Sequence, residues 1–543
     1  MVTSNQPPPL EPYNLFTTDS VLSEALNREA GEAERDQLVD FGKRVGAEEV
    51  FRWGDEANRY TPVLRTHDRF GDRIDEVDYH PSYHSLMQLS VSEGIHCSRF
   101  EKPPGEGAYV TRNARAYLIA QVEMGHGCPL SMTSSVLPSL RHQPDLAETW
   151  EPRILSRTYD PRSIPPADKH GLLLGMGMTE CQGGSDVRAN ISTARPSNGR
   201  GPGAEYRLTG HKWFTSAPMC DAFLMLAQAP GGLSCFLVPR ILADGARNGL
   251  RFQRLKDKLG NRSNASSEVE FDNVAGWLVG EEGRGVPTII EMVNGTRVDC
   301  VVWSAGLMRQ AVAQAGWHVA HRTAFGSKLI DKPLMQNVMA DLELETEAAT
   351  LMMMRLSGAH DAAPLDEFQA AFTRLATPVA KYWVTKRCSP VVREALECVG
   401  GNGYVEESIL PRLYRESPLN AIWEGAGNVI ALDVLRAIQR SPESVDAFFE
   451  ELNLAGGSEP LLDHEIDGLR KAVVDAGSEA AARRLIEGLA VAWGASLLVR
   501  HGDQHVSDVY LASRIGGDRG SMFGTLPESD SLGDIARRAV PAE

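Results

Sequence analysis

The spacing of hydrophobic positions changes twice along the chain. Over residues 1–170 the apolar residues recur at helical spacing, as in 22–51, 83–95 and 114–124, and prolines separate these stretches. From about residue 171 the apolar segments become short and turn residues separate them, which is typical of β-strands. The pattern therefore predicts a helical domain followed by a β domain.

Long helical patterns return after the β region. Residues 288–324 contain no proline, and 334–359 and 365–396 follow after short links, so these three stretches predict a helix bundle. After a Ser-Pro break, the alanine-rich pattern of residues 472–499 again predicts helix, whereas 516–533 are rich in Gly, Ser and Asp and are expected to be loose.

We therefore predict an α+β multidomain protein with four regions. They are an N-terminal helical domain (1–170), a central β domain (171–285), a C-terminal helical bundle (286–440) and an appended helical domain (441–543). The strands expected in the β domain are 172–178, 206–208, 223–227, 235–238, 250–254 and 269–271.

Composition narrows the class of protein. A hydrophobic fraction of 42% and a charged fraction of 23% are typical of globular proteins, and the net charge of −17 opposes general attraction to nucleic acid or anionic membranes. The eight cysteines have no C-x-x-C pair or zinc-ligand spacing, so we expect reduced thiols and no metal site. The polar start of the chain and the lack of an apolar run near 18 residues predict a cytoplasmic protein without signal peptide or membrane span.

The first stretch with chemical content opens the β region at Met178–Val187, with the sequence M-T-E-C-Q-G-G-S-D-V. Thr179 and Ser185 supply hydroxyls, and the two glycines between them expose backbone N–H groups that suit an anionic or polar ligand. The stretch is neither a phosphate-binding P-loop nor a dinucleotide-binding glycine motif. A purely structural Gly/Ser loop remains the alternative.

Three further stretches could contact a planar, phosphorylated ligand. Gly210–Ser216 reads G-H-K-W-F-T-S, in which an indole stands beside hydroxyls, although a buried strand with a Trp would look the same. In H-R-T-A-F-G (321–326), Arg322 could hold a phosphate or simply favour a helix C-terminus. Residues 399–404, V-G-G-N-G-Y, predict a glycine-rich turn between helices.

The most chemically suggestive carboxylate is Glu424. It follows the bulky Ile422 and Trp423 and precedes the small-residue turn Gly425–Gly427. Partial dehydration at such a place raises the pKa of a carboxylate toward the range useful to a general base. The alternative is a helix-start turn in which the glutamate only complements the helix dipole.

In order and spacing these motifs resemble the acyl-CoA dehydrogenase flavoprotein family over about residues 80–440. The matching series is T-E-x-x-G-G-S-D, K-W-F-T-S, Arg297, H-R-x-x-F-G, Gln336, G-G-N-G-Y and I-W-E-G. The appended segment, L-K-D-K-L-G-N-R-S-N-A-S (255–266) and L-P-R-L-Y-R-E (410–416) resemble its AidB-like branch, which is linked to the response to alkylation damage of DNA.

The resemblance implies a helical N-domain, a central β-barrel or sandwich and a C-terminal four-helix bundle, with FAD between the β domain and the bundle. It implies a homotetramer, because subunits share cofactor sites. Expected FAD contacts are Met178, Thr179, Gly184, Ser185, Trp213, Phe214, Thr215, Ser216, Trp423, Gly425, Gly427 and Asn428. Those expected to reach a neighbouring subunit's FAD are Arg322, Phe325, Gln336, Gly400, Gly401, Asn402 and Gly403.

The same resemblance implies α,β-dehydrogenation of a short or branched acyl-CoA, with electrons passing to an electron-transfer flavoprotein or another acceptor. Glu424 matches the family's usual base, since Thr296 stands where the isovaleryl-type branch places its base on an earlier helix. Arg297 matches an arginine that anchors substrate, and Trp423 replaces the commoner Tyr, which would narrow the acyl pocket.

The alternative function is a DNA-binding flavoprotein with little or no dehydrogenase activity. The arginines matching the branch's DNA-facing set are Arg436, Arg440, Arg500 and Arg514, with Arg483 and Arg484 nearby. Against it, residues 441–543 hold nine basic and eighteen acidic residues, a net charge of −9. Direct repair of alkylated bases by the flavin would need a base-flipping pocket, for which the sequence offers no feature.

Overall fold

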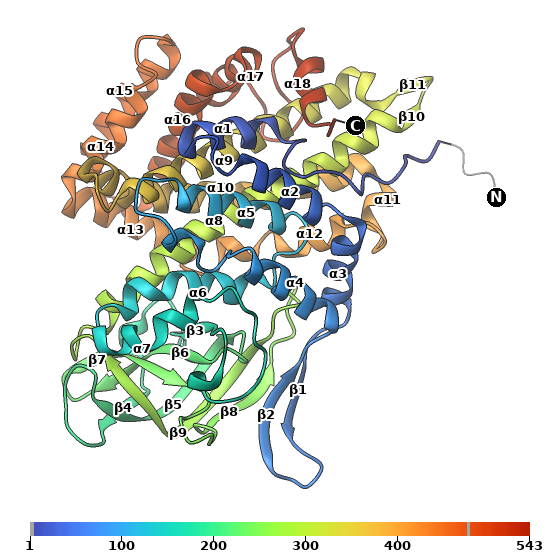
Figure 1. The fold of residues 1–543 in the computed structure, drawn as a ribbon. Coiled ribbons are helices and arrows are strands. Elements are labelled where there is room, and N and C mark those ends of the chain that lie inside the picture. Colours follow the sequence, from blue (N-terminus) through green and yellow to red (C-terminus); the bar gives the residue numbers. More distant parts are fainter. Residues whose placement is uncertain (1–4, 475–477, 543) are drawn as a thin grey trace. The chain divides into compact units, whose positions relative to one another are not determined.

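The computed structural model, drawn in Figure 1, describes residues 5–474 and 478–542. The chain divides into two compact units. Unit 1 comprises Met1–Phe51, Lys102–Val122 and Arg297–Glu543, and unit 2 comprises Arg52–Glu101 and Glu123–Thr296. The region predicted as an N-terminal helical domain therefore contributes to both units, and the appended region belongs to the same unit as the bundle.

The sheet of unit 2 closes on itself. Strand pairing runs β6–β4–β5–β9–β7 and returns from β7 to β6, while β3 pairs with β6 and β8 with β9. The strands are β3 (Leu174–Gly177), β4 (Thr193–Pro196), β5 (Glu205–Ser216), β6 (Ala222–Ala229), β7 (Gly232–Pro239), β8 (Leu250–Leu255) and β9 (Ser266–Val279). Ring closure leaves few unpaired strand edges. The predicted central β domain is confirmed, and of the two forms left open, barrel or sandwich, the closed ring is a barrel.

Burial along the strands follows their sequence patterns. The continuous apolar run of β6 is covered on both faces, and its Phe223, Leu224 and Met225 are all fully buried. In β8 the apolar Leu250 and Phe252 are buried, and Arg251, Gln253 and Arg254 are exposed. Helix α6 (Gly127–Leu140) packs against β3.

The sequence pattern missed one hairpin in unit 2, formed by β1 (Val63–His67) and β2 (Arg73–Asp78) in antiparallel register (Figure 1). Its strands carry many charged residues, and Arg65 forms a bidentate ion pair with Asp78 across the hairpin at 2.5 and 2.9 Å. Because few of its residues are apolar, the pair of strands gave no hydrophobic alternation.

The predicted bundle of unit 1 is present. It is built on α8 (Gly285–His321), which belongs to unit 1 from Arg297 onward, α9 (Pro333–Ala362) and α10 (Glu367–Val399), of which α9 and α10 pack side by side (Figure 1). A shorter helix, α13 (Gly427–Arg440), packs on α10. The start of α10 is capped by Asp366, whose carboxylate accepts hydrogen bonds from the N–H groups of Phe368 and Gln369.

The N-terminal helices are shorter than the sequence pattern indicated. Instead of one helical stretch, α1 (Ser20–Ala30), α2 (Arg35–Val45) and α3 (Glu48–Arg59) follow one another. The first break is at Gly31, whose φ of 73° favours glycine and ends the helix. The remaining helices of the region are α4 (Pro81–Ser92), α5 (Ala108–Ala120) and α7 (Pro144–Ile154).

The appended region packs directly on the bundle. It holds α14 (Pro442–Asn453), α15 (Pro460–Val474), α16 (Ala482–His501), α17 (Gln504–Tyr510) and α18 (Leu532–Arg538). Helix α16 packs against α9, α10 and α13, and its buried Trp493 lies edge-on to Phe372 and Phe448 at 5.4 and 5.8 Å between ring centroids. Among the described residues, none of the helices has the length and apolarity needed to cross a membrane.

Candidate active site

Glu424 lies in a strained turn of unit 1, between the short 3₁₀ helix Leu419–Ala421 and α13. Its φ is 59°, in the left-handed region that residues other than glycine rarely adopt, and the φ of the following Gly425 is 107°. Strain of this kind costs about 1–3 kcal/mol and persists only where surrounding contacts hold it. The Glu424 side chain is half-buried.

Two buried cations hold this turn by its backbone. Lys381 of α10 donates from Nζ to the carbonyl oxygens of Trp423, at 3.0 Å, and Gly425. Arg297 of α8 donates from Nε to the carbonyl oxygen of Glu424 itself, at 3.0 Å. Three consecutive carbonyls, 423 to 425, thus accept hydrogen bonds from charged donors. Such bonds are stronger than neutral ones and fix the peptide planes on both sides of Glu424.

Asp433 of α13 keeps Arg297 in place. Its carboxylate accepts from Arg297 at 2.8 Å and from Arg374 of α10 at 3.0 Å, and Arg436 approaches at 3.5 Å. With one end of the guanidinium on Asp433 and the other on the Glu424 carbonyl, Arg297 supports the turn. The substrate-anchoring role predicted for Arg297 stays a prediction.

Trp423 is fixed in its orientation beside Glu424. Its Nε1 donates to the side-chain oxygen of Asn420 at 2.9 Å, and the buried Asn420 amide donates to Ser304 at 3.1 Å. The ring lies 6.1 Å from that of Trp303. A hydrogen-bonded indole held in this way forms a rigid wall next to the carboxylate.

The second group of predicted residues lies in unit 2, on the loop after β3 and on β5. A Cβ atom added to Gly184 would lie 2.5 Å from the Thr179 hydroxyl, so only glycine permits this close turn. The Trp213 N–H donates to the Thr179 carbonyl at 2.8 Å, which joins the loop to β5. Met178 and Thr179 are half-buried, and Ser185 is exposed.

A buried ion pair sets the geometry of this loop. Lys212 and Glu180 are both fully buried, with Nζ 2.7 Å from the carboxylate. Glu180 also accepts from the Ile191 N–H at 2.7 Å, and Lys212 donates to the Leu226 carbonyl at 2.7 Å. Burial by itself raises the pKa of Glu180, but Lys212 and the N–H donors outweigh it and lower the pKa.

Two aromatic residues near the end of β5, Trp213 and Phe214, are partly exposed within unit 2. Phe214 is 50% exposed, and the Lys256 ammonium lies 3.6 Å from the centroid of the half-buried Trp213 ring. Within the described part of the chain the buried hydroxyl of Thr215 has no hydrogen-bond partner, whereas Ser216 pairs with Ser266. A groove of about 470 Å³ runs beside Trp213 over β5, β8 and β9.

Two of the segments expected to reach a neighbouring subunit, the hairpin after α8 and the glycine-rich turn, contact the start of the chain in unit 1. Phe325, at the tip of the hairpin β10 (Thr323–Ala324)–β11 (Ser327–Lys328), is 96% exposed. The Asn5 side chain pairs with the backbone of Thr323 at 2.7 and 2.8 Å, and its carbonyl accepts from Arg322.

The glycine-rich turn is linked to the same N-terminal segment. Gly400, with a φ of 69°, precedes the short helix α11 (Gly401–Tyr404), and Asn402 of this helix donates to Gln6 at 3.0 Å. Gln336 is half-buried in the first turn of α9. The structure thus connects the hairpin and the glycine turn, while their role toward another subunit stays a prediction.

The candidate DNA-facing arginines separate into two groups. Arg436 is 56% exposed and Arg440 is exposed on α13, as are the neighbouring Arg483 and Arg484 on α16. The Arg500 side chain is only 13% exposed and is paired with the buried Glu451 at 3.1 Å. Little of Arg500 is left for contact with a phosphate.

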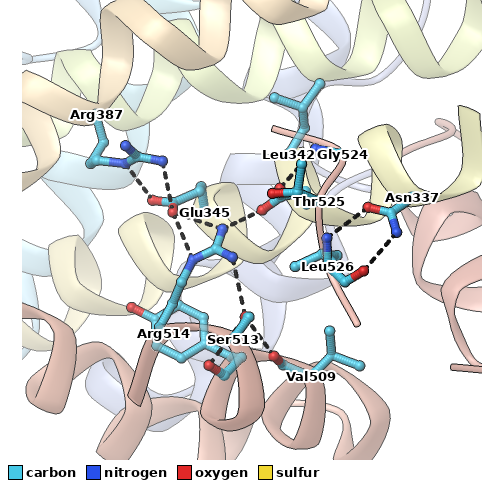
Figure 2. A network of polar contacts seen from close by, with 12 residues as sticks. Asn337, Leu342, Glu345, Arg387, Val509, Ser513, Arg514, Gly524, Thr525 and Leu526 are labelled. Carbon is cyan, nitrogen blue, oxygen red and sulfur yellow. Dashed lines mark hydrogen bonds and ion pairs between the residues drawn. The ribbon is translucent and has the colours of Figure 1, made fainter. Parts of the chain in front are cut away.

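The prediction that Arg514 faces DNA is wrong, because its side chain is 1% exposed. Figure 2 shows it pointing at Glu345, which it contacts at 2.9 Å while Arg387 contacts the same carboxylate at 3.0 Å. Arg514 also pairs with Asp341. It is an internal cation that joins the appended region to α9.

Three family profiles match successive parts of the chain. They are described as "Adaptive response protein AidB N-terminal domain" over residues 5–161, "Acyl-CoA dehydrogenase, middle domain" over 175–274 and "Acyl-CoA dehydrogenase, C-terminal domain" over 283–439. The chain is 45% identical to AidB of Escherichia coli (strain K12) over 480 residues, which is 88% of each protein. It belongs to the AidB branch of the acyl-CoA dehydrogenase family.

Two further similarities agree with this membership. Acyl-CoA dehydrogenase family member 11 of Caenorhabditis elegans is 31% identical over 86% of this chain and 77% of its own length. The crystal structure of the Caenorhabditis elegans protein ACDH-11, in complex with C11-CoA, superposes with a TM-score of 0.85 at 27% identity. It covers 99% of this chain and 93% of that chain, so the resemblance extends through the appended region.

Acyl-CoA dehydrogenases bind FAD, and the residues of unit 2 fit a flavin in three ways. The space above Gly183 in the loop after β3 is open, with no atom within 4 Å of an added Cβ; Phe214 is 50% exposed; and among the described residues the buried Thr215 hydroxyl has no hydrogen-bond partner. An unpartnered buried hydroxyl costs stability unless a bound group satisfies it.

Sequence reasoning missed the residues that hold these motifs. Lys381 and Asp433 organise the Glu424 turn, and Glu180 and Lys212 organise the loop after β3. For Lys381 a signal existed, since it is a single charge in the apolar run P-V-A-K-Y-W-V of α10. A lone buried lysine needs partners, but the sequence could not show that these are the carbonyls of a turn some 40 residues later.

Proposed function

We propose that this protein is an FAD-dependent acyl-CoA dehydrogenase that acts on a short or branched acyl-CoA, with Glu424 as the base. The observation that carries the proposal is the Glu424 turn: a glutamate in left-handed backbone conformation, held through three consecutive carbonyls by Lys381 and Arg297. Strained backbone that several charged groups maintain is typical of functional positions.

Glu424 takes the α-proton of the acyl thioester in this reaction. Its value as a base depends on a fixed direction of approach, which the backbone contacts of Lys381 and Arg297 supply. The Trp423 indole, held by Asn420, limits the space beside the carboxylate and favours a short or branched acyl chain. Bound FAD would accept the hydride from the β-carbon.

Family membership and the local geometry support an assignment of the cofactor residues. We assign the flavin contacts to Met178, Thr179, Gly184, Ser185, Trp213, Phe214, Thr215 and Ser216, and further FAD contacts to Trp423, Gly425, Gly427 and Asn428. The exposed hairpin with Phe325 and the adjoining Gly400–Gly403 turn would serve the FAD of another subunit, and we propose a homotetramer on this basis. An electron-transfer flavoprotein is the proposed acceptor.

Turnover with an artificial electron acceptor tests the base. In Glu424→Gln we expect kcat for enoyl-CoA formation to fall by about 10²–10⁴-fold with unchanged FAD content, because general-base catalysis contributes about that much. Product would be measured by mass spectrometry with isovaleryl-CoA, butyryl-CoA and C11-CoA, the last because the worm relative was crystallised with it. The matched control is Glu407→Gln, because Glu407 is exposed and the variant is expected to turn over as fast as wild type. If Glu424→Gln turned over as fast as wild type, the proposal would be contradicted.

Binding of duplex DNA is the second candidate function, and one observation favours it. Arg436 and Arg440 of α13 and Arg483 and Arg484 of α16 are all exposed, and the two helices pack together. Four cations on adjoining helices could contact phosphates although the region as a whole is acidic.

The DNA candidate is tested by the salt dependence of binding. In Arg440→Ala/Arg484→Ala the slope of log K against log salt should fall by about 0.9 for each lost phosphate contact. Arg59→Ala on α3, 57% exposed, is the control at a distant position in the sequence. Retention that is absent, or that does not change with salt, rules out this function.

A further inference from the structure

Lys381 is buried in an unusual place for a lysine. It lies in α10 between Ala380 and Tyr382 and is 1% exposed, and burial lowers the pKa of its ammonium. Taking an ammonium out of water costs several kcal/mol, so a helix position of this kind would normally hold an apolar residue. The cost indicates that the charge serves a purpose beyond packing.

The contacts of Lys381 point to the Glu424 turn. Its Nζ donates to the carbonyls that precede and follow Glu424, those of Trp423 and Gly425. The two carbonyls belong to the peptide groups that flank the pair Glu424–Gly425. By holding both peptide groups, the bonds fix the positive φ angles of these two residues. Without them the glutamate could relax to a negative φ, which would redirect its side chain.

We propose that Lys381 is a positioning residue for Glu424: it fixes the direction of the carboxylate by holding the carbonyls on either side of it. The inference rests on the proposed function. Arg297 shares this task, but its guanidinium is divided between the Glu424 carbonyl and Asp433. Lys381 spans Glu424 from both sides.

The charge of Lys381 also acts on Glu424 directly. The negative charge of Glu424 is among the influences that favour the charged form of Lys381, and by reciprocity the ammonium favours the carboxylate. Other charged or titratable groups among the described residues that face this lysine include Cys300 and Arg297 of α8 and Lys386 of α10. Removal of the ammonium therefore takes away a favourable electrostatic contact of the Glu424 carboxylate.

The test replaces the lysine in the FAD-loaded enzyme. In Lys381→Met we expect kcat to fall by about 10–100-fold, the loss typical of a catalytic group displaced by about 1 Å. KM and FAD content should stay within about threefold, and the acidic limb of the pH profile of kcat should move to higher pH. Lys381→Gln, which keeps a donor without the charge, should recover part of kcat but not the pH profile.

A crystal structure of Lys381→Met gives a readout that does not depend on activity. Loss of the positive φ at Glu424 is expected, and an unchanged turn with unchanged kcat and pH profile overturns the inference. If the methionine variant does not fold, the same three readouts on Lys381→Gln decide. Arg393→Met, 50% exposed on the same helix, is the control.

Failure of the proposed function would look different. The wild-type protein itself would then form no enoyl-CoA from any acyl-CoA. Failure of the Lys381 inference alone would instead appear as an active wild type together with a Lys381→Met variant that keeps its turn, kcat and pH profile. In an inactive wild type the crystal structure alone decides whether Lys381 holds the Glu424 turn.

Discussion

At the scale of single residues, buried cations explain how conspicuous motifs obtain their geometry. The loop after β3 was visible in the sequence through its glycines and hydroxyls, yet its shape depends on the fully buried pair Glu180–Lys212. Arg297 and Lys381 have the same relation to Glu424. In each case a charged side chain supports backbone carbonyls or N–H groups of the segment that carries the motif.

Removal of one member of the β-domain pair should be costly. In Lys212→Met the Glu180 carboxylate stays buried without its cation, and we expect the free energy of unfolding to fall by about 3–5 kcal/mol. The loss in the free energy of unfolding is measured by urea unfolding of the apoprotein. The double variant Lys212→Met/Glu180→Gln should regain more than half of the loss, because no charge remains buried; a double variant as unstable as the single one would contradict this account.

The residue scale also shows where prediction from sequence stops. Glu424, Trp213 and Thr179 could be selected because chemistry and local order single them out, but hydrogen bonds between distant segments could not be read from spacing. Arg514 was misjudged for the same reason. In the sequence it is a basic residue near the chain end, and only the fold reveals the two carboxylates of α9 that surround it.

At the scale of elements, α9 carries the attachment of the appended region. Glu345 accepts from Arg514 at 2.9 Å and from Arg387 of α10 at 3.0 Å, while Asn337 exchanges two hydrogen bonds with the backbone of Leu526 at 3.0 Å (Figure 2). These contacts join the start and middle of α9 to the chain around residues 514–526.

The buried Arg514 should matter far more than an exposed ion pair of the same region. Arg514→Met leaves Asp341 and Glu345 buried with fewer cations, and we expect a loss of about 3–5 kcal/mol in the free energy of unfolding. Arg537→Met removes a pair with Asp331 in which Arg537 is 50% exposed, and should cost less than about 1 kcal/mol. Equal losses in the two variants would contradict the described burial.

The same cluster predicts a dependence on pH. Burial raises the pKa of Glu345, but Arg387 and Arg514 outweigh it and lower the pKa from 4.5 to about 2. A carboxyl group whose pKa is lowered by folding stabilises the folded state fully at pH values above its pKa in the unfolded chain. This stabilisation, about 3 kcal/mol for Glu345, is lost as the pH falls toward 2. The stability difference between wild type and Arg514→Met should therefore shrink between about pH 5 and 2 in urea unfolding series. A difference that stays constant over that range excludes this contribution.

At the element scale the sequence pattern was most informative for long helices and apolar strands. The helices α8, α9 and α10 and the strand β6 were expected from periodicity and apolar runs. The hairpin β1–β2 and the four-residue strand β4 were missed, because charged or short strands do not produce a hydrophobic period.

At the scale of the whole molecule, the order of domains along the chain differs from its division into compact units. Parts of the N-terminal region belong with the β domain and parts with the bundle, and the appended region shares a unit with the bundle. Hydrophobic pattern alone could not show this, since it describes segments but not their partners. Family membership explains why the AidB-type N-terminal profile and the two acyl-CoA dehydrogenase profiles follow one another in this chain.

The most direct test of the central claim is anaerobic titration of the FAD-loaded protein with isovaleryl-CoA, butyryl-CoA and C11-CoA, followed by the visible absorbance of the flavin. Our account predicts stoichiometric bleaching with at least one of these substrates and none in Glu424→Gln. An FAD-loaded wild type that keeps its full absorbance with all three would contradict the account and leave the exposed arginines of α13 and α16 as the remaining basis for a function.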